Sequence, residues 1–461
     1  MRTAITHLFE RDRRGRVAGD GVSFPAQRSA AVAANERRPR VVIIGGGFGG
    51  LSAARALAGA AADVTLIDRH NYHLFQPLLY QVATGGLPPN AIAAPIRAIL
   101  HAQRNATVLM GSVTAIDTAG RTVRLHDRNI AYDFLVVASG ARHAYFGHDD
   151  WEKFAPGIKT LADALCIRQQ ILSTFEAAEC SDDASERRRL LNFVLIGAGP
   201  TGVELAGAIS ELAKVSLGHD FRNIDAREAR ILLVEAGSRV LPTFPERLSA
   251  CARRELEKLG VEVRLGAAVT VCDADGVVVG DERIEARTII WAAGVAASPA
   301  ATWLSALADR AGRVEVGEDL SVPGHPDIFV VGDTCLSKSW NGKPAPGIAP
   351  AAKQMGVHAA AVIRARIEGS RPPPPFRYRH DGSLATVGRN NAVADLGRLK
   401  LSGAAAWLVW AAAHIFFLIE FRSRVVVTFE WLWSYFTFRR SARLILNETG
   451  AMQGRPAQQS P

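Results

Sequence analysis

Two carboxylates follow two glycine-rich turns, and this pairing is the strongest chemical signal in the 461-residue chain. Asp68 ends a short apolar run 18 residues after Gly50. Glu235 ends a second apolar run 33 residues after Gly202. A carboxylate at the end of the second strand of such a unit accepts hydrogen bonds from the ribose of a dinucleotide. Two units in one chain therefore indicate two dinucleotides held close together, with electron transfer between them.

Three glycines in each turn have separate roles at a phosphate-binding loop. The first permits a tight turn, and the second lets the backbone approach a pyrophosphate. The third allows the next helix to pack closely on the strand, with the phosphate at the helix N-terminus. In this order they are Gly45, Gly47 and Gly50 in the first turn, and Gly197, Gly199 and Gly202 in the second.

The same succession of elements must position both sets of residues. A buried strand leads into the turn, a helix follows, a second strand ends at the carboxylate, and a later apolar strand ends in small residues. The predicted elements are strand 41–44, helix 51–58, strand 64–67 and strand 134–140 in the first unit, and strand 193–196, helix 203–209, strand 231–234 and strand 289–294 in the second. We interpret the polar stretch 218–223 as an insertion in an otherwise repeated unit.

The two carboxylates also predict which nucleotide is used. A 2′-phosphate beside Asp68 or Glu235 would face a second anion, so NADH is predicted over NADPH. Arg239 lies four residues beyond Glu235 and can soften this preference.

Two further acidic residues lie where they can act on a bound nucleotide. Glu204 lies one turn inside the second helix, where it either orients a nicotinamide and influences protons near a flavin, or is a glutamate stabilised by the helix dipole. Its position leaves both interpretations open. The strand 327–333 ends in Gly332 and Asp333, which can place a backbone amide and a carboxylate against a ribityl or phosphate group.

The basic charge lies at the two ends of the chain. The net charge of +9 consists of +5 in residues 1–40, +7 in residues 371–461 and −3 in between. Because apolar runs interrupt the basic tail, an anionic lipid surface fits it better than nucleic acid, and no nucleic-acid partner is expected. Residues 1–39 lack an apolar h-region and are predicted to be a disordered basic arm rather than a secretory signal, with a transit peptide or a wrongly assigned start codon as alternatives.

Two apolar runs in the tail predict membrane association. The first, 401–419, carries no charge and is just long enough to cross a bilayer. The second, 425–438, is rich in aromatic residues, and the arginines around it are Arg422, Arg424, Arg439, Arg440 and Arg443. Aromatic side chains beside arginines favour a segment that lies in the interface. One transmembrane span or hairpin and a soluble docking helix are the alternatives.

The five cysteines are scattered along the chain, without a C-x-x-C pair. This spacing argues against a disulfide framework, an iron–sulfur site and a redox-active dithiol. No metal site is predicted.

Together these motifs resemble those of the type II NADH dehydrogenases, single-subunit NADH:quinone oxidoreductases that do not pump protons. The resemblance covers roughly residues 40–445. The matching segments are the first glycine turn with the stretch 68–83, the stretch 197–204, the Gly332–Asp333 pair, and the tail segments 382–389 and 433–436.

The resemblance implies FAD at the first turn and NADH at the second. Asp68 would lie at the adenosine ribose of FAD, Asp333 near its ribityl–phosphate region, and the stretch from Gln76 to Gln81 beside the isoalloxazine. Glu235 would hold the ribose of NADH, with Glu204 near the nicotinamide. A hydride would pass from NADH to the flavin, and two electrons would pass on to a membrane quinone without proton pumping.

One motif departs from the family pattern. The quinone-side motif usually reads Ala-Gln-x-Ala-x-Gln, whereas residues 349–354 read Ala-Pro-Ala-Ala-Lys-Gln. Pro350 replaces the first glutamine and offers neither a side-chain amide nor a backbone N–H. Gln354 is expected to line the quinone pocket, with Lys353 compensating for the lost amide.

The expected fold is α/β, with two doubly wound, Rossmann-like dinucleotide-binding domains, one nested in the other, and a C-terminal membrane-anchoring helical region. The predicted bounds are 1–39 for the basic arm, 40–160 and 312–370 for the FAD-binding domain, 161–311 for the NADH-binding domain and 371–461 for the membrane-association region. The resemblance also implies a peripheral or monotopic location on the cytoplasmic face of a bacterial cell membrane. Homodimer formation is left open.

Two other functions are also left open. A sulfide:quinone reductase shares the architecture but needs catalytic cysteines near the flavin, and neither Cys166 nor Cys335 lies where that enzyme needs its pair. The other function is a redox sensor that binds both nucleotides with little turnover. NADH oxidation with a soluble quinone would exclude the sensor, and an assay with sulfide tests the sulfide:quinone reductase.

Overall fold

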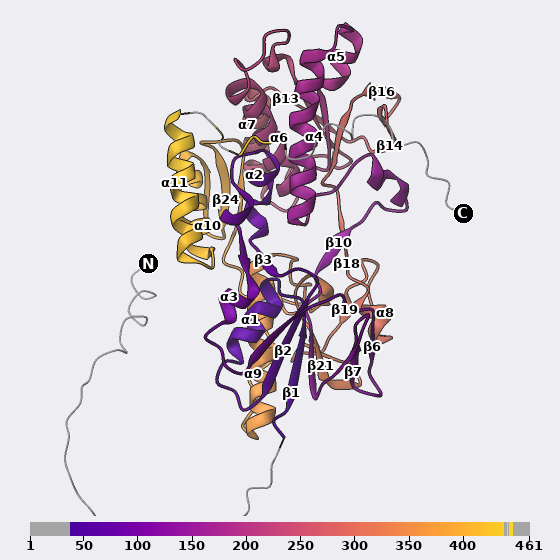
Figure 1. The fold of residues 1–461 in the computed structure, drawn as a ribbon, viewed down its shortest axis with the longest axis vertical. Helices are drawn as coiled ribbons and strands as arrows, with labels where there is room; N and C mark the ends of the chain where they lie inside the picture. Colours follow the sequence, from indigo (N-terminus) through magenta and orange to yellow (C-terminus); the bar gives the residue numbers. More distant parts are fainter. Residues whose placement is uncertain (1–36, 438–439, 441, 446–461) are drawn as a thin grey trace, which may run out of the picture. The chain divides into compact units, whose positions relative to one another are not determined.

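The computed structural model describes residues 37–437, 440 and 442–445. Most of the predicted basic arm, 1–36, therefore lies outside the described residues. The chain divides into two units, 1–38 and 39–461, and the elements below belong to the second unit (Figure 1).

The first glycine turn belongs to a six-stranded sheet built from two distant parts of the chain. In spatial order its strands are β20 (Ser321–Val322), β21 (His325–Val330), β9 (Phe134–Val137), β1 (Arg40–Ile44), β2 (Asp63–Asp68) and β5 (Ala106–Met110). All neighbouring pairs are parallel except β20 with β21. The central strand β1 is a run of valines and isoleucines that is buried from Val41 to Ile44, as expected for a parallel strand covered on both faces.

Helices α1 (Phe48–Ala56) and α9 (Ala349–Glu368) pack along each other beside this sheet (Figure 1). Their close approach depends on Gly356, because a Cβ there would lie 2.1 Å from the carbonyl oxygen of Gly49. Through this packing α9, which comes after the nested domain in the chain, contacts the helix that follows the first glycine turn.

The second glycine turn belongs to a separate four-stranded parallel sheet. Its strands in spatial order are β13 (Val261–Leu265), β12 (Arg230–Glu235), β11 (Asn192–Ile196) and β17 (Thr288–Trp291). The helices of this part are α4 (Leu161–Cys180), α5 (Ala184–Leu190), α6 (Pro200–Glu211) and α7 (Glu246–Lys258). All four strands lie between β9 and β20 in the chain, so the predicted nesting of one dinucleotide-binding fold in the other is confirmed.

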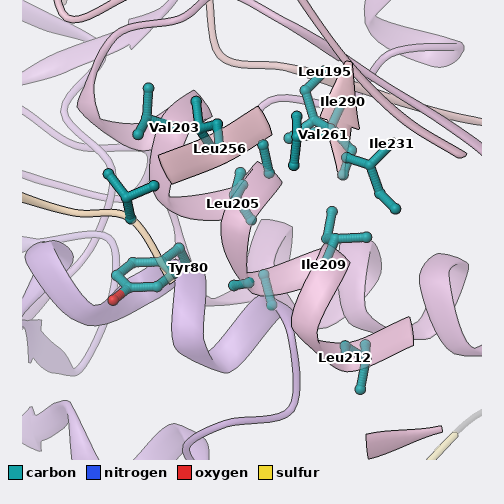
Figure 2. Packing of buried hydrophobic residues seen from close by; sticks show 14 of the residues in the cluster. Tyr80, Leu195, Val203, Leu205, Ile209, Leu212, Ile231, Leu256, Val261 and Ile290 are labelled. Atoms are coloured by element: carbon teal, nitrogen blue, oxygen red, sulfur yellow. The ribbon is translucent and has the colours of Figure 1, made fainter. Parts of the chain in front are cut away.

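A large apolar core joins α6 to this second sheet. Figure 2 shows Leu205 and Ile209 of α6 close to Ile231 and Ile290 of the strands. Tyr80, from the first half of the chain, borders the same cluster, and its phenol oxygen points away from the aliphatic side chains (Figure 2). The core of the nested domain therefore includes residues of the outer one.

The longer spacing before Glu235 arises from a helical extension as well as a loop. Helix α6 begins at Pro200, earlier than predicted, and continues into a π-helical turn, Leu212–Ser216. The polar stretch 218–223 follows as a turn and loop before β12. The extra residues before Glu235 are therefore not confined to 218–223, where they were predicted, but also include the π-helical turn at the end of α6.

The two segments that connect the outer domain to the nested domain pair with each other. Strand β10 (Ala141–His143) leads toward the nested domain, and β18 (Val295–Ala297) returns from it. The two strands form an antiparallel ribbon, with Ala141 opposite Ala297.

The C-terminal region is a three-stranded antiparallel sheet followed by two helices, which lie side by side in Figure 1. Its elements are β23 (Ser383–Thr386), β24 (Ala392–Leu396), β25 (Leu399–Gly403), α10 (Ala404–Phe417) and α11 (Phe421–Thr437). The apolar run 401–419 is thus divided, because its first residues complete β25 and the helix starts after Gly403, whose φ is +74°. Phe438 of the second run lies outside the described residues. Within the described ranges, no helix combines the length and apolarity needed to cross a membrane.

Smaller elements connect these parts. The short strands are β3 (Tyr72–Leu74), β4 (Ala93–Pro95), β6 (Ala115–Asp117), β7 (Thr122–Arg124), β8 (Asn129–Ala131), β14 (Val269–Asp273), β15 (Gly276–Val279), β16 (Glu282–Glu285), β19 (Val314–Glu315) and β22 (Cys335–Leu336). The short helices are α2 (Leu79–Ala83), α3 (Ile96–Leu100) and α8 (Ala300–Leu304).

Candidate functional site

The first glycine turn has the form that a phosphate-binding loop needs. Gly45 has φ +103°, and a Cβ there would lie 2.3 Å from the carbonyl oxygen of Ala138. A Cβ on Gly50 would lie 1.9 Å from the carbonyl oxygen of Gly45, so α1 can pack this closely only with glycine. By contrast, a Cβ on Gly47 would meet no atom within 4 Å. The backbone at Gly47 therefore borders open space at the N-terminus of a helix, where a pyrophosphate can bind.

The second turn repeats this geometry. Gly197 also has φ +103°, and a Cβ on Gly202 would lie 1.8 Å from its carbonyl oxygen. The middle position is again open, because a Cβ on Gly199 would meet no atom within 4 Å. The two turns thus have the same closed and open positions, which supports one nucleotide at each.

Both predicted ribose carboxylates lie against the turn of their own unit. Asp68 accepts a hydrogen bond from the N–H of Gly46 at 2.5 Å and one from the N–H of His70 at 2.7 Å. Glu235 accepts the matching bond from the N–H of Ala198 at 2.7 Å. These bonds fix each carboxylate beside its turn and leave further acceptor positions on its oxygens, because a carboxylate has about four lone-pair sites.

Lys159, which was not among the predicted site residues, brings Asp333 and Gln76 together. The ammonium of Lys159 lies 3.3 Å from the carboxylate of Asp333, and both side chains are mostly buried. The side-chain amide of Gln76 donates to the backbone carbonyl of Lys159 at 2.9 Å. Lys159 precedes Thr160, the N-cap of α4, and a capping box with Asp163 holds this segment in place. That capping pattern is the sequence signal that marks the position of Lys159.

Glu204 lies at a largely buried junction of three parts of the chain. Its carboxylate accepts a long hydrogen bond, 3.5 Å, from the N–H of Thr386 in β23. The hydroxyl of Thr386 lies 3.0 Å from that of Tyr80 in α2. Burial raises the pKa of the Glu204 carboxyl to about 8. Burial also raises the pKa of Tyr80, with the nearby Glu204 as the next largest cause.

The same junction extends to the last helix. The amide of Gln81 donates to the Tyr80 hydroxyl at 2.9 Å, and its oxygen accepts from the indole N–H of Trp431 at 2.8 Å. A continuous set of polar contacts therefore joins Glu204 of α6 to Trp431 of α11. Tyr80 belongs to the stretch expected beside the isoalloxazine, but its contact with Thr386 and the contact of Gln81 with Trp431 could not be predicted, because they join residues that are far apart in the chain.

The predicted quinone-side residues lie in the first turns of α9. Pro350 is in the first turn of that helix, where its missing N–H breaks no intrahelical hydrogen bond. The ammonium of Lys353 lies 5.3 Å from the ring centre of Phe48, beside the first glycine turn, and 4.9 Å from that of Phe417, at the end of α10. Burial lowers the pKa of Lys353. The amide of Gln354 is paired with the backbone of Arg379, donating at 2.9 Å and accepting at 3.0 Å.

Helices α10 and α11 expose an unusual number of large apolar side chains. Phe416 is 69% exposed, Phe421 79% and Phe436 74%. Others on the same two helices are Leu408, Phe417, Val425, Phe429, Leu432, Trp433 and Tyr435. Many exposed large apolar side chains on two neighbouring helices are typical of an interaction site. We call these residues the aromatic face.

Two alternative kinds of site gain no support from the described part of the chain. Cys335 is buried, and burial raises the pKa of its thiol, which makes it a poor thiolate; Cys166 is exposed on α4. No disulfide joins the cysteines, all of which are free. Among the described residues, no group of three or more His, Cys, Asp or Glu is placed to hold a metal ion.

Comparisons with known proteins agree with this geometry. The pyridine nucleotide-disulphide oxidoreductase family matches residues 39–356, and the NDH2 C-terminal domain matches residues 380–440. Two relatives from Mycobacterium tuberculosis are the type II NADH:quinone oxidoreductases Ndh and NdhA. Ndh is 45% identical over 89% of this chain and 91% of its own length. NdhA is 47% identical over 86% of each chain.

Solved structures show the same fold. NDH2 from Plasmodium falciparum in complex with NADH superposes with a TM-score of 0.81 at 22% identity, covering 89% of this chain and 100% of that one. The sulfide:quinone oxidoreductase of Aquifex aeolicus has a TM-score of 0.65 at 19% identity, covering 92% of this chain and 100% of that one. At these identities the likeness concerns the fold alone.

Proposed function

The chain belongs to the pyridine nucleotide-disulphide oxidoreductases and, within them, to the type II NADH:quinone oxidoreductases, and from this premise we propose which of its residues carry the reaction. The protein is a flavoprotein that transfers electrons from NADH to a quinone without pumping protons. The observation that carries the assignment is the pair of matching turns, each with a carboxylate fixed beside it.

FAD and NADH fit the residues present at the two turns. The open positions at Gly47 and Gly199 leave room for a pyrophosphate at each helix N-terminus. Asp68 would hold the ribose of FAD, and Glu235 that of NADH. Around the flavin, Lys159 and Asp333 would bind polar groups, with Gln76 holding the Lys159 backbone. FAD, when bound, supplies the hydride-accepting and electron-donating chemistry, while the protein supplies position and electrostatics.

Glu204 is proposed to hold a proton at the junction of the two halves. With a pKa of about 8, its carboxyl group is mainly protonated at neutral pH. A neutral acid can donate a hydrogen bond, which a carboxylate cannot do. The helix dipole alone would favour the charged form, so the raised pKa supports the active-site interpretation of this residue over the structural one.

Lys353 is proposed to line the path of the quinone. It lies between Phe48 at the first turn and Phe417 on the aromatic face, so it connects the expected flavin site to an apolar entrance. An ammonium group there can donate a hydrogen bond to a quinone oxygen, the contact that Pro350 cannot make. Gln354 is proposed to shape the same pocket by holding the segment at Arg379 through its amide.

We propose that the aromatic face rests on an anionic lipid surface at the cytoplasmic face of a bacterial membrane. Exposed aromatic side chains suit the interface, and the exposed Arg422 adds attraction to anionic headgroups. Phe421→Ser together with Phe436→Ser should weaken sedimentation with anionic vesicles. Leu307→Ser, which alters a 76% exposed residue after α8, should not. Equal sedimentation of the wild type, the double variant and Leu307→Ser with the vesicles would contradict a role of the aromatic face in membrane binding.

A single preparation tests the proposed function. The purified protein should show a flavin absorption spectrum, oxidise NADH with a soluble quinone, and show no activity with sulfide. Lys353→Met should raise the KM for quinone without changing the KM for NADH. Turnover with sulfide, or a flavoprotein that binds both nucleotides without oxidising NADH, would contradict the proposal. Sedimentation velocity of the same sample tests the homodimer.

A further inference from the structure

Phe146 is a large apolar side chain held exposed in an uncommon backbone conformation. It follows β10, and it is 70% exposed. Its φ is +53°, in the left-handed region that bulky residues rarely adopt. Residues with such backbone angles cluster at functional sites, where the surrounding structure holds them in place.

The contacts of Phe146 fix its ring over a glycine. A Cβ on Gly294 would lie 2.4 Å from Cζ of Phe146, so the ring lies directly against this glycine. The ring centre is 6.1 Å from that of Trp291. The flanking backbone is also held, because the Trp291 indole donates to the Ala144 carbonyl at 3.0 Å and the Ala144 N–H donates to the Gly294 carbonyl at 3.2 Å.

The segment under this ring packs against the second glycine turn. A Cβ on Gly197 would lie 2.4 Å from the Cα of Ala293. The N–H of Ala292 donates to the carbonyl of Ile196 at 2.7 Å. Phe146 therefore lies beside the proposed NADH site, although it belongs to the connection that precedes the nested domain.

The strand order indicates which half of NADH lies near Phe146. Glu235 ends β12, on one side of β11, and Gly294 follows β17 on the other side. A dinucleotide crosses the carboxyl ends of the strands, with its pyrophosphate at the central turn. If Glu235 holds the adenosine ribose, the nicotinamide half lies on the β17 side.

We infer that Phe146 is a positioning residue for the nicotinamide half of NADH, against which its ring packs. This inference rests on the proposed function. Aromatic rings favour offset stacking or edge contacts with other flat rings, so Phe146 can both orient the nicotinamide and keep water from it. The apolar area that is exposed without a ligand is then covered when NADH binds.

The test compares two ligands that differ only by the nicotinamide ring. Binding of NAD⁺ and of ADP-ribose to the FAD-loaded protein is measured by calorimetry. Phe146→Ala should weaken NAD⁺ binding about tenfold, or about 1.4 kcal/mol, and leave ADP-ribose binding within twofold. Phe146→Tyr should restore NAD⁺ binding. In turnover, Phe146→Ala should raise the KM for NADH and leave the KM for quinone unchanged.

Two controls keep a folding defect apart from a binding defect. Leu307→Ala removes another exposed apolar side chain and should change neither ligand. Phe146→Gly removes the ring and suits a positive φ, so it should keep or raise the melting temperature while still weakening NAD⁺ binding. The inference is overturned if NAD⁺ and ADP-ribose weaken equally, or if neither weakens. A wild-type protein that binds neither ligand would instead contradict the proposed function.

Discussion

Replacing Glu204 with glutamine should stabilise the protein, and the gain should grow with pH. The pKa of Glu204 is about 8 in the folded chain, against an ordinary value of 4.5. An acid whose pKa is raised on folding binds more protons in the folded state, so it destabilises the fold as pH rises above 4.5 and reaches its full penalty above 8. The penalty is about 1 kcal/mol at pH 5 and about 4 kcal/mol at pH 8. Glu204→Gln removes it.

The assay is thermal unfolding of the wild type and the variant at both pH values. With an unfolding entropy of about 2.1 cal/mol/K per residue over 461 residues, 1 kcal/mol corresponds to about 1 °C. The melting-temperature advantage of Glu204→Gln should therefore increase by about 3–4 °C from pH 5 to pH 8. Glu368→Gln, at an exposed position late in α9, is the control and should show no such increase. A constant or shrinking advantage for the Glu204 variant would refute the reasoning.

Three further predictions follow from particular contacts. Gly199→Ala should fold normally but raise the KM for NADH at least about tenfold, because its Cβ would enter the open space where a phosphate is proposed to bind. By contrast, Gly202→Ala should fail to fold, because its Cβ would lie 1.8 Å from a carbonyl oxygen. Arg440→Ala should lower the melting temperature by about 3–5 °C, because it leaves the Glu211 carboxylate, 3.5 Å from the guanidinium, buried without that partner. The ratio of kcat/KM values should favour NADH over NADPH, and Glu235→Ala should reduce that ratio.

Each of these has an outcome that would count against it. Equal melting temperatures for Gly199→Ala and Gly202→Ala would show that the close contact at Gly202 relaxes. Arg440→Lys keeps the charge and should lose less stability than Arg440→Ala; the same loss in both would assign the effect to packing. A preference for NADPH in the wild type would contradict the role given to Glu235.

Local pattern was sufficient to predict the nucleotide-binding elements. The valine–isoleucine run of β1, the glycines after it and the carboxylate of Asp68 are close together in sequence, and their roles depend on backbone geometry that neighbours determine. The same holds for β11, Gly197 and Glu235. These features repeat twice, so the nested α/β fold could be predicted from the chain alone.

The polar junction at Glu204 could not be predicted in this way. Tyr80 and Thr386 are 306 residues apart, and their contact exists because the C-terminal sheet packs on α6. A positive φ at Phe146 could not be expected from the sequence either, since glycine is the residue that usually marks such positions. Pro350 lies in the first turn of α9, where its missing N–H costs the helix no hydrogen bond, and compensation for the lost glutamine amide by Lys353 stays a prediction.

Pairing of the connecting strands β10 and β18 affects the order in which the nested domain and the outer sheet fold. The outer sheet must join β9, which ends at Val137, to β21, which begins at His325, across the whole nested domain. Closing a flexible loop of roughly 190 residues costs about 4–5 kcal/mol in chain entropy. Once the nested domain has folded and Ala141 is paired with Ala297, the remaining loop is roughly 30 residues long, and the cost falls by about 1–2 kcal/mol. Folding of the nested domain should therefore precede and assist completion of the outer sheet, because it brings β9 and β21 close together.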